Sequence, residues 1–176
     1  MHTSLILIGM KSSGKTSIGQ VLAQRMGVAF IDVDQRLEAH YLQATGTQHT
    51  FRQILAQHGA DYFRALEQTV LRALATELQT KRAVLATGGG TVLNAENRAI
   101  LATMGQVIYL DVAEAVLLPR IIAGGIPAFF PYPDDPERSL HELLATRRPI
   151  YLAMADRVIA YSNEAPEIVA EWIAKA

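Results

Sequence analysis

The residues best suited to chemistry form one short segment near the start of the chain, Gly9-Met10-Lys11-Ser12-Ser13-Gly14-Lys15-Thr16. This segment matches the pattern G-x-x-x-x-G-K-[ST] at every fixed position. Its glycines allow the backbone to curl, so that successive amide N–H groups point at phosphate oxygens. In such a loop Lys15 reaches the β- and γ-phosphates and the Thr16 hydroxyl binds Mg²⁺. The sequence therefore predicts a site for a nucleoside triphosphate.

The context of this loop supports the same interpretation. An apolar run, Leu5 to Ile8, precedes it and predicts a buried strand, and a helix is expected from near Thr16, whose positive N-terminal end favours phosphate. Lys11 is an additional cation inside the loop, although a lysine that points into solvent would look the same in sequence. We expect the nucleotide to contact Gly9, Lys11, Ser12, Ser13, Gly14, Lys15, Thr16 and Ser17.

Two carboxylates follow the second predicted strand, residues 28–31. Asp32 and Asp34 are two residues apart, and alternate residues of an extended segment point the same way, so both can face the phosphate loop. One can support Mg²⁺ through water, and the other can hold and deprotonate an acceptor hydroxyl. A solvated turn with an aspartate cap on the next helix is the alternative that spacing alone leaves open.

Three further features could complete an acceptor site. Gly88, Gly89 and Gly90 follow the apolar strand 83–86, and three glycines there are costly unless a ligand must approach the backbone closely. Phe63-Arg64-x-x-Glu67 lies on a predicted helix, and Arg147-Arg148-Pro149-Ile150-Tyr151 lies on a later one. Arginines are common on solvated surfaces, so each of these alone is weak.

The elements that must position these residues alternate along the chain. Strands are predicted at about 5–8, 28–31, 83–86, 107–110 and 157–161, with helical patterns between them and a last helix from near Pro166. This alternation favours an α/β fold with a parallel sheet and right-handed crossovers, in which ligands bind at the carboxyl ends of the strands. We predict one domain over residues 1–176, with a mobile lid at about 124–137 and an acceptor-binding helical segment at about 35–66.

The composition excludes several other classes. The chain has 176 residues, a formal net charge of −1 and no cysteine, so disulfides and thiolate metal sites are ruled out. Balanced charge gives no general attraction to nucleic acid or membranes, and the apolar runs are too short to span a bilayer. A GTPase of the usual kind would carry Asn-Lys-x-Asp, which is absent. We expect a cytoplasmic protein that acts as a monomer on small molecules.

Together these segments resemble the shikimate kinase family over essentially the whole chain. The resemblance implies the nucleoside-monophosphate-kinase-like fold, with a five-stranded parallel sheet flanked by helices. It also implies transfer of the ATP γ-phosphoryl group to the 3-hydroxyl of shikimate. Carried over by position, it implies the following roles: Asp34 binds the shikimate hydroxyls and acts as the base, Arg64 and Arg147 clamp the carboxylate, Gly88, Gly89 and Gly90 contact the substrate, Asp32 and Thr16 serve Mg²⁺, and Arg120 lies against the adenine.

The chain departs from this family in two places. The lid of the family has an arginine just before a proline, and Ile126 stands at that position here. Arg138 or Lys11 could substitute for it. The stretch 39–50 is also several residues longer than usual. The alternatives to a shikimate kinase are therefore a kinase for another small hydroxy acid or polyol, and a nucleotide- or shikimate-binding protein with little catalysis.

Overall fold

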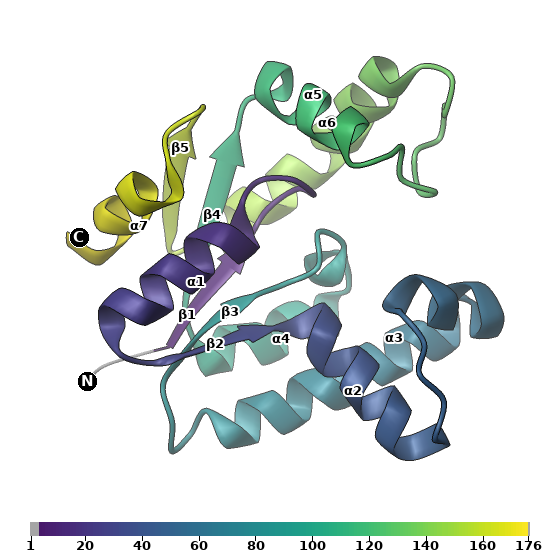
Figure 1. The fold of residues 1–176 in the computed structure, drawn as a ribbon, viewed down its shortest axis with the longest axis vertical. Coiled ribbons are helices and arrows are strands. Elements are labelled where there is room, and N and C mark those ends of the chain that lie inside the picture. Colours follow the sequence, from purple (N-terminus) through teal and green to yellow (C-terminus); the bar gives the residue numbers. More distant parts are fainter. Residues whose placement is uncertain (1–3, 176) are drawn as a thin grey trace.

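A five-stranded parallel sheet forms the centre of the molecule (Figure 1). The computed structural model describes residues 4–175. The strands lie in the order β2-β3-β1-β4-β5, and every neighbouring pair is parallel. Their bounds are Ser4–Ile8 for β1, Ala29–Asp32 for β2, Ala83–Ala86 for β3, Gly105–Val112 for β4 and Arg157–Tyr161 for β5. The predicted α/β class with a five-stranded parallel sheet is confirmed.

Helices connect the strands and cover both faces of the sheet (Figure 1). They are α1 (Lys15–Met26), α2 (Val33–Thr45), α3 (Phe51–Glu77), the 3₁₀ turn η1 (Thr91–Leu93), α4 (Ala95–Met104), α5 (Glu114–Ala123), α6 (Pro136–Met154) and α7 (Pro166–Lys175). Within residues 4–175, no helix combines the length and apolar character that a membrane span requires.

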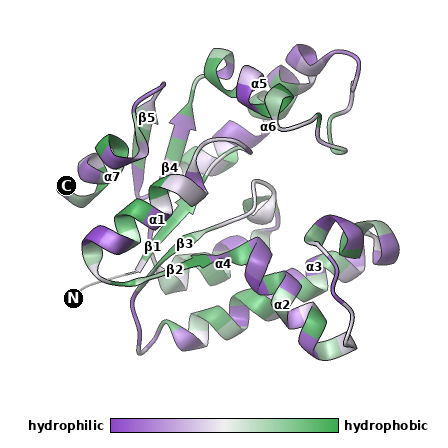
Figure 2. Ribbon diagram, in the orientation of Figure 1, coloured by the Kyte–Doolittle hydropathy of each residue, from purple (hydrophilic) through white to green (hydrophobic). Residues whose placement is uncertain are grey.

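The apolar residues of β1 divide between two core layers, because successive side chains of a strand point to opposite faces. Ile6 and Ile8 pack with residues of α2, α3 and α4, whereas Leu5 and Leu7 pack with residues of α1, α5 and α7. Figure 2 shows the same strand as a continuous hydrophobic stretch within the sheet. A strand that is buried on both faces explains why this run lacks a polar alternation.

The strand order places the phosphate loop at a crevice. β1 lies between β3 and β4, and the chain leaves β1 toward β2 on one side and later reaches β4 on the other. The loops that follow β1, β2 and β3 emerge at the same edge of a parallel sheet, which is where ligands bind in such folds. The three loops singled out from sequence therefore share one edge.

Some boundaries differ from the sequence prediction. The interval 124–135 separates α5 from α6, so residues 136 and 137, which were predicted to belong to a mobile lid at about 124–137, lie in a helix. The end of the interval is set by the Asp135 side chain, which accepts a hydrogen bond from the Arg138 backbone N–H and caps α6. The kink in α3 lies at Gly59, whose φ of 81° interrupts an otherwise continuous helix.

Gly105, at the start of β4, lies in close contact with the backbone of β1. A Cβ atom at Gly105 would lie 2.1 Å from the Ser4 carbonyl oxygen, which is backbone and cannot move aside. We expect Gly105→Ala to lower the free energy of unfolding by about 1–3 kcal/mol in urea denaturation. Gly124→Ala is the matched control, because its nearest contact of 3.5 Å is ordinary. Equal stability of the two variants would contradict the packing.

Candidate active site

The loop between β1 and α1 forms a cradle around the Lys15 ammonium. Its Nζ donates hydrogen bonds to the carbonyl oxygens of Gly9 and Met10, each at 2.9 Å. The turn needs left-handed backbone at Gly14, with φ of 78°, and at Ser12, with φ of 66°. Ser12 is the only non-glycine residue with positive φ in the described chain, and such strain is typical of ligand-binding loops.

Burial makes the charge of Lys15 costly. The side chain is almost fully buried, and desolvation lowers the pKa of Lys15 to about 8, although the carboxylates of Asp34 and Asp32 oppose this shift. Its contacts are to neutral oxygen atoms, so its charge lacks a full partner within the cradle. A phosphate at this position would stabilise the charged ammonium.

A cavity of about 420 Å³ opens beside the cradle. Arg120 of α5 forms one wall, and its guanidinium donates to the Ser162 carbonyl oxygen at 2.9 Å and to Asn163 Oδ1 at 3.2 Å. Tyr161 forms another wall, with its hydroxyl donating to the Ser13 carbonyl oxygen. The cavity is lined by Ser12, Gly14, Lys15, Thr16, Ser17, Ile18, Arg120, Tyr161, Glu164 and Pro166. Its size and position suit a nucleoside attached to phosphates in the cradle.

Asp32 links the cradle to the next helix. One carboxylate oxygen, Oδ1, accepts hydrogen bonds from the backbone N–H groups of Asp34 and Gln35 and thus caps α2. The other oxygen, Oδ2, accepts from the Thr16 hydroxyl at 3.3 Å. Asp32 therefore caps the next helix, as the alternative interpretation expected, and it also lies beside Thr16, as predicted.

Asp34 lies at the bottom of the crevice. A Cβ atom at Gly88 would lie 2.9 Å from Asp34 Oδ1, so this glycine lets the two loops approach. Burial, followed by the charge of Asp32, raises the pKa of Asp34 to about 6, while Lys15 opposes the rise. A carboxylate of this pKa is suited to accept a proton near neutral pH.

The glycine loop after β3 and the turn that follows it are anchored by Tyr151 and Glu67, for which no such role was predicted. The Tyr151 hydroxyl of α6 donates to the Gly89 carbonyl oxygen at 2.6 Å. The buried Glu67 carboxylate accepts from the Thr91 hydroxyl and from Asn97 Nδ2, both at 2.7 Å. Glu67 and Tyr151 belong to segments noted in the sequence, but their anchoring roles depend on hydrogen bonds to residues that are distant in the chain.

Arg64 and Arg147 come from α3 and α6. Arg64 is exposed, and its charge acts on Glu67. Arg147 is half-buried: its Nη1 lies 3.8 Å from the Met10 sulfur, and its guanidinium carbon lies 5.0 Å from the Phe129 ring centroid. Among the described residues, neither arginine forms an ion pair within 4.0 Å. Both guanidinium groups therefore have donors left for an acidic ligand.

The segment 124–135, which the sequence predicts to be a lid, carries several apolar side chains. Phe130 is buried in the core layer of α1, α5 and α7, whereas Ile126 and Phe129 are exposed. Arg138, the first cation after the lid, donates to Glu142 at 3.0 Å and to the Tyr132 hydroxyl at 3.1 Å. It also stacks 3.9 Å from the Tyr132 ring centroid. These contacts already employ the guanidinium that the sequence suggested as a substitute for a lid arginine.

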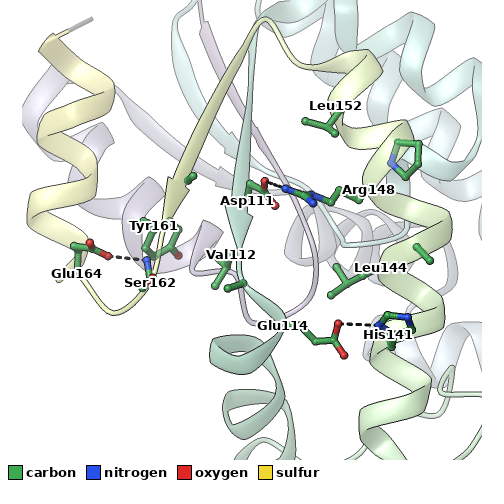
Figure 3. Close-up of a pocket in the computed structure, with 14 residues that line it drawn as sticks. Asp111, Val112, Glu114, His141, Leu144, Arg148, Leu152, Tyr161, Ser162 and Glu164 are labelled. Carbon is green, nitrogen blue, oxygen red and sulfur yellow. Dashed lines mark hydrogen bonds and ion pairs between the residues drawn. The ribbon is translucent and has the colours of Figure 1, made fainter.

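A larger groove of about 820 Å³ lies between the ends of β4 and β5 and α6 (Figure 3). Its charged groups pair with one another: Arg148 Nη2 lies 2.7 Å from Asp111 Oδ2, and His141 Nδ1 lies 3.2 Å from Glu114 Oε2. None of the residues predicted to bind a ligand lines it. Because its polar groups are already satisfied, the smaller cavity beside the cradle is the better candidate for chemistry.

Several known proteins are similar to this chain over nearly its whole length. The family model described as shikimate kinase matches residues 11–176. A protein named shikimate kinase from Synechococcus sp. (strain CC9605) is 42% identical over 170 residues, which cover 97% of this chain and 80% of that protein. A protein of the same name from Thermobifida fusca (strain YX) is 36% identical, covering 97% of this chain and 92% of that protein.

Solved structures show the same likeness. The shikimate kinase from Acinetobacter baumannii in complex with shikimate matches with a TM-score of 0.85 and 31% identity, over 98% of this chain and 91% of that one. The shikimate kinase from Aquifex aeolicus matches with a TM-score of 0.76 and 29% identity, over 98% of this chain and 95% of that one.

The raised pKa of Asp34 has a consequence for stability. Because the native state binds this proton more tightly than the unfolded chain, Asp34 costs stability as the pH rises from about 4 to about 6. We expect Asp34→Asn to raise the free energy of unfolding at pH 8 by about 1–2 kcal/mol, with no gain at pH 4. Urea denaturation at the two pH values measures this. Asp134→Asn, in the exposed lid, is the control, and an equal effect of both variants would argue against burial as the cause.

Proposed function

Because the chain belongs to the shikimate kinase family, whose members are phosphotransferases that act on a hydroxyl group, we propose how its residues phosphorylate the 3-hydroxyl of shikimate with ATP. The observation that carries the proposal is the crevice in which the Lys15 ammonium and the Asp34 carboxylate influence each other's pKa. The site thus holds a cation for the donor and a base for the acceptor that interact electrostatically.

The donor side is the cradle and its cavity. The phosphates lie against the backbone of Gly9 to Thr16, with Lys15 leaving its carbonyl contacts to bind the β- and γ-phosphates. The adenine occupies the cavity beside Arg120. Lys11, Ser12, Ser13, Gly14 and Ser17 complete the phosphate contacts in this proposal.

The acceptor side is built around Asp34. Its carboxylate accepts the proton of the shikimate 3-hydroxyl, whose oxygen then forms a bond to the γ-phosphorus as the bond from that phosphorus to the bridging oxygen breaks and ADP leaves. Gly88, Gly89 and Gly90 allow the sugar-like ring to approach the backbone. This catalysis consists mostly of positioning and charge neutralisation.

Arg64 and Arg147 hold the carboxylate of shikimate. A guanidinium can bind a carboxylate with two parallel hydrogen bonds, which fixes both position and orientation. The support is that both side chains lack an ion pair among the described residues and that Arg147 lies next to Met10 of the cradle.

Mg²⁺ fits the oxygen atoms of Thr16 and Asp32. A hydroxyl and a carboxylate are ligands of the kind that Mg²⁺ prefers, and the remaining positions would be filled by water and by phosphate oxygens. When bound, the ion neutralises phosphate charge. Within residues 4–175, no cluster of three or more acidic, histidine or cysteine side chains offers a site made of protein alone.

The sequence further leads us to propose one catalytic domain with a lid at about 124–137 and an acceptor segment at about 35–66. The proposal also includes a monomeric state and a cytoplasmic location, without nucleic acid or membrane partners. Light scattering on the purified chain tests the oligomeric state, and a mass twice that of the 19.3 kDa chain would refute the monomer.

Shikimate-dependent release of ADP tests the proposed function directly. We expect turnover that requires both Mg²⁺ and shikimate, and one new phosphate monoester in the ³¹P spectrum. Shikimate methyl ester, which lacks the carboxylate charge, is the matched control and should react far more slowly. Failure of shikimate to raise ADP release above the blank would refute the assignment.

The coupled pKa values predict a bell-shaped pH profile for kcat/KM. Asp34 must be ionised to accept a proton, so activity should fall below pH about 6. Lys15 must be charged to hold phosphate, so activity should fall above pH about 8. Because Asp34 and Lys15 interact, the two pKa values read from the profile describe the pair together. A profile that stays flat between pH 5 and pH 9 would contradict both roles.

Arg147 and its neighbour provide a matched pair of substitutions. Arg147→Lys removes the paired donors of the guanidinium, and we expect the KM for shikimate to rise by about 10–100-fold with little change in the KM for ATP. Arg148→Lys affects an arginine bound to Asp111 in the groove, and should leave both values within about twofold. Equal effects of the two changes would exclude a specific role for Arg147.

A further inference from the structure

The lid segment supplies no positive charge to the site. Residues 124–135 contain no lysine or arginine, and they end on Asp134 and Asp135. Arg138, the next cation along the chain, is held by Glu142 and stacked on Tyr132. Transfer of a phosphoryl group develops negative charge that an additional cation normally stabilises. That cation must come from another element.

Lys11 lies where the cradle meets the acceptor loop. Its backbone nitrogen is 3.1 Å from the position that a Cβ atom at Gly89 would occupy, so the two loops are in contact at this residue. Its side chain is half-buried, and within residues 4–175 no ion pair or side-chain hydrogen bond involves its ammonium. Lys15, by contrast, points back into the cradle at the carbonyl oxygens of Gly9 and Met10.

A second cation, Arg52, acts electrostatically on Lys11. Arg52, in the first turn of α3, brings its positive charge near Lys11, and burial together with this charge lowers the pKa of Lys11. No carboxylate counters that shift, and within the described chain Arg52 takes part in no ion pair. Because Lys11 has no ion-pair partner among the described residues, an anion bound at its ammonium relieves the repulsion from Arg52.

The position of Lys11 indicates which anion its ammonium binds. The Lys15 ammonium points into the cradle, whereas the Lys11 backbone meets the loop of Gly89, which the proposed function assigns to the acceptor. We propose that Lys11, supported by Arg52, is a catalytic cation that binds the γ-phosphoryl group as it passes to the acceptor. This inference rests on the proposed function and assigns to the phosphate loop the charge that Ile126 cannot supply from the lid.

Steady-state kinetics of Lys11→Met test the proposal. We expect kcat to fall by about 10²–10³-fold, with the KM for shikimate and the dissociation constant of ADP within about threefold of the wild type. Lys11→Arg keeps the charge and should retain kcat within about tenfold. Lys81→Met, an exposed lysine paired only with Glu77, is the control for loss of a surface lysine. A wild-type kcat in Lys11→Met would overturn the proposal.

Two other outcomes would also overturn it. A rise in the KM for shikimate with kcat unchanged would assign Lys11 to binding of the acceptor. A greater fall in kcat for Arg138→Met than for Lys11→Met would assign the phosphoryl charge to the arginine that ends the lid. Wild-type turnover with shikimate in the same assay leaves the proposed function intact in each case, so the two failures are distinguishable.

Binding of a phosphoryl mimic gives a readout that needs no turnover. Aluminium fluoride added with ADP and Mg²⁺ imitates the planar phosphoryl group, and calorimetry compares ADP binding with and without it. We expect aluminium fluoride to tighten ADP binding to the wild type by at least tenfold more than to Lys11→Met. An equal increase in both proteins would show that Lys11 does not contact this group.

Addition of an arginine to the lid provides the complementary test. Ile126→Arg should raise kcat at least tenfold in the Lys11→Met background, because it restores a cation over the phosphates. The same change in the wild type should have an effect below about threefold, because Lys11 already supplies that charge. A large gain in the wild type would mean that the transferring group lacks a cation in the native chain, and would contradict the proposal.

Discussion

The buried charge of Lys15 is the constraint on which the site depends. Its ammonium contacts carbonyl oxygens of its own loop, and burial keeps its pKa near 8. Such a charge is tolerated because the loop curls around it and because Asp34 lies across the crevice. The same curl requires left-handed backbone at Ser12, and it leaves a cavity beside the loop, with Arg120 in its wall.

The same constraint explains why three loops converge. Asp34 can influence Lys15 only if β2 and β1 end at the same edge of the sheet, and Gly88, which lacks a Cβ atom, leaves room for the Asp34 carboxylate. Tyr151 then fixes the glycine loop from α6 through the Gly89 carbonyl. The core behind them, with β1 buried on both faces, keeps these loops in register.

Much of this arrangement could be predicted from sequence because the relevant signals are local. The pattern from Gly9 to Thr16 dictates a phosphate loop, and the apolar run before it dictates a buried strand. Asp32 and Asp34 could be placed beside the phosphate loop because they follow a predicted strand, but the expectation that both lie in an extended segment was wrong, since Asp34 lies in the first turn of α2. The anchoring roles of Glu67 and Tyr151 could not be predicted, because their partners Thr91 and Gly89 are distant in the chain and become neighbours only when the helices pack.

The contacts within the predicted lid and the predicted acceptor segment could not be foreseen from the sequence either. Spacing suggested that Arg138 could serve the phosphates, but a contact with Glu142 four residues away and stacking on Tyr132 employ its guanidinium. The longer stretch 39–50 was predicted only as part of a helical segment, with no indication of what holds it in place. In the structure, Tyr41 organises it by stacking on His49 and by a 2.8 Å hydrogen bond with His58, which sequence spacing does not reveal.

The burial of Asp34 and its coupling to Lys15 are tested most directly by ¹³C NMR titration of the Asp34 carboxyl carbon, in the wild type and in Lys15→Met. We expect a pKa of about 6 for Asp34 in the wild type and a higher pKa once the opposing ammonium is removed. A carboxyl group that titrates near 4 in both proteins would contradict this expectation, since Asp34 would then be neither buried nor coupled to Lys15.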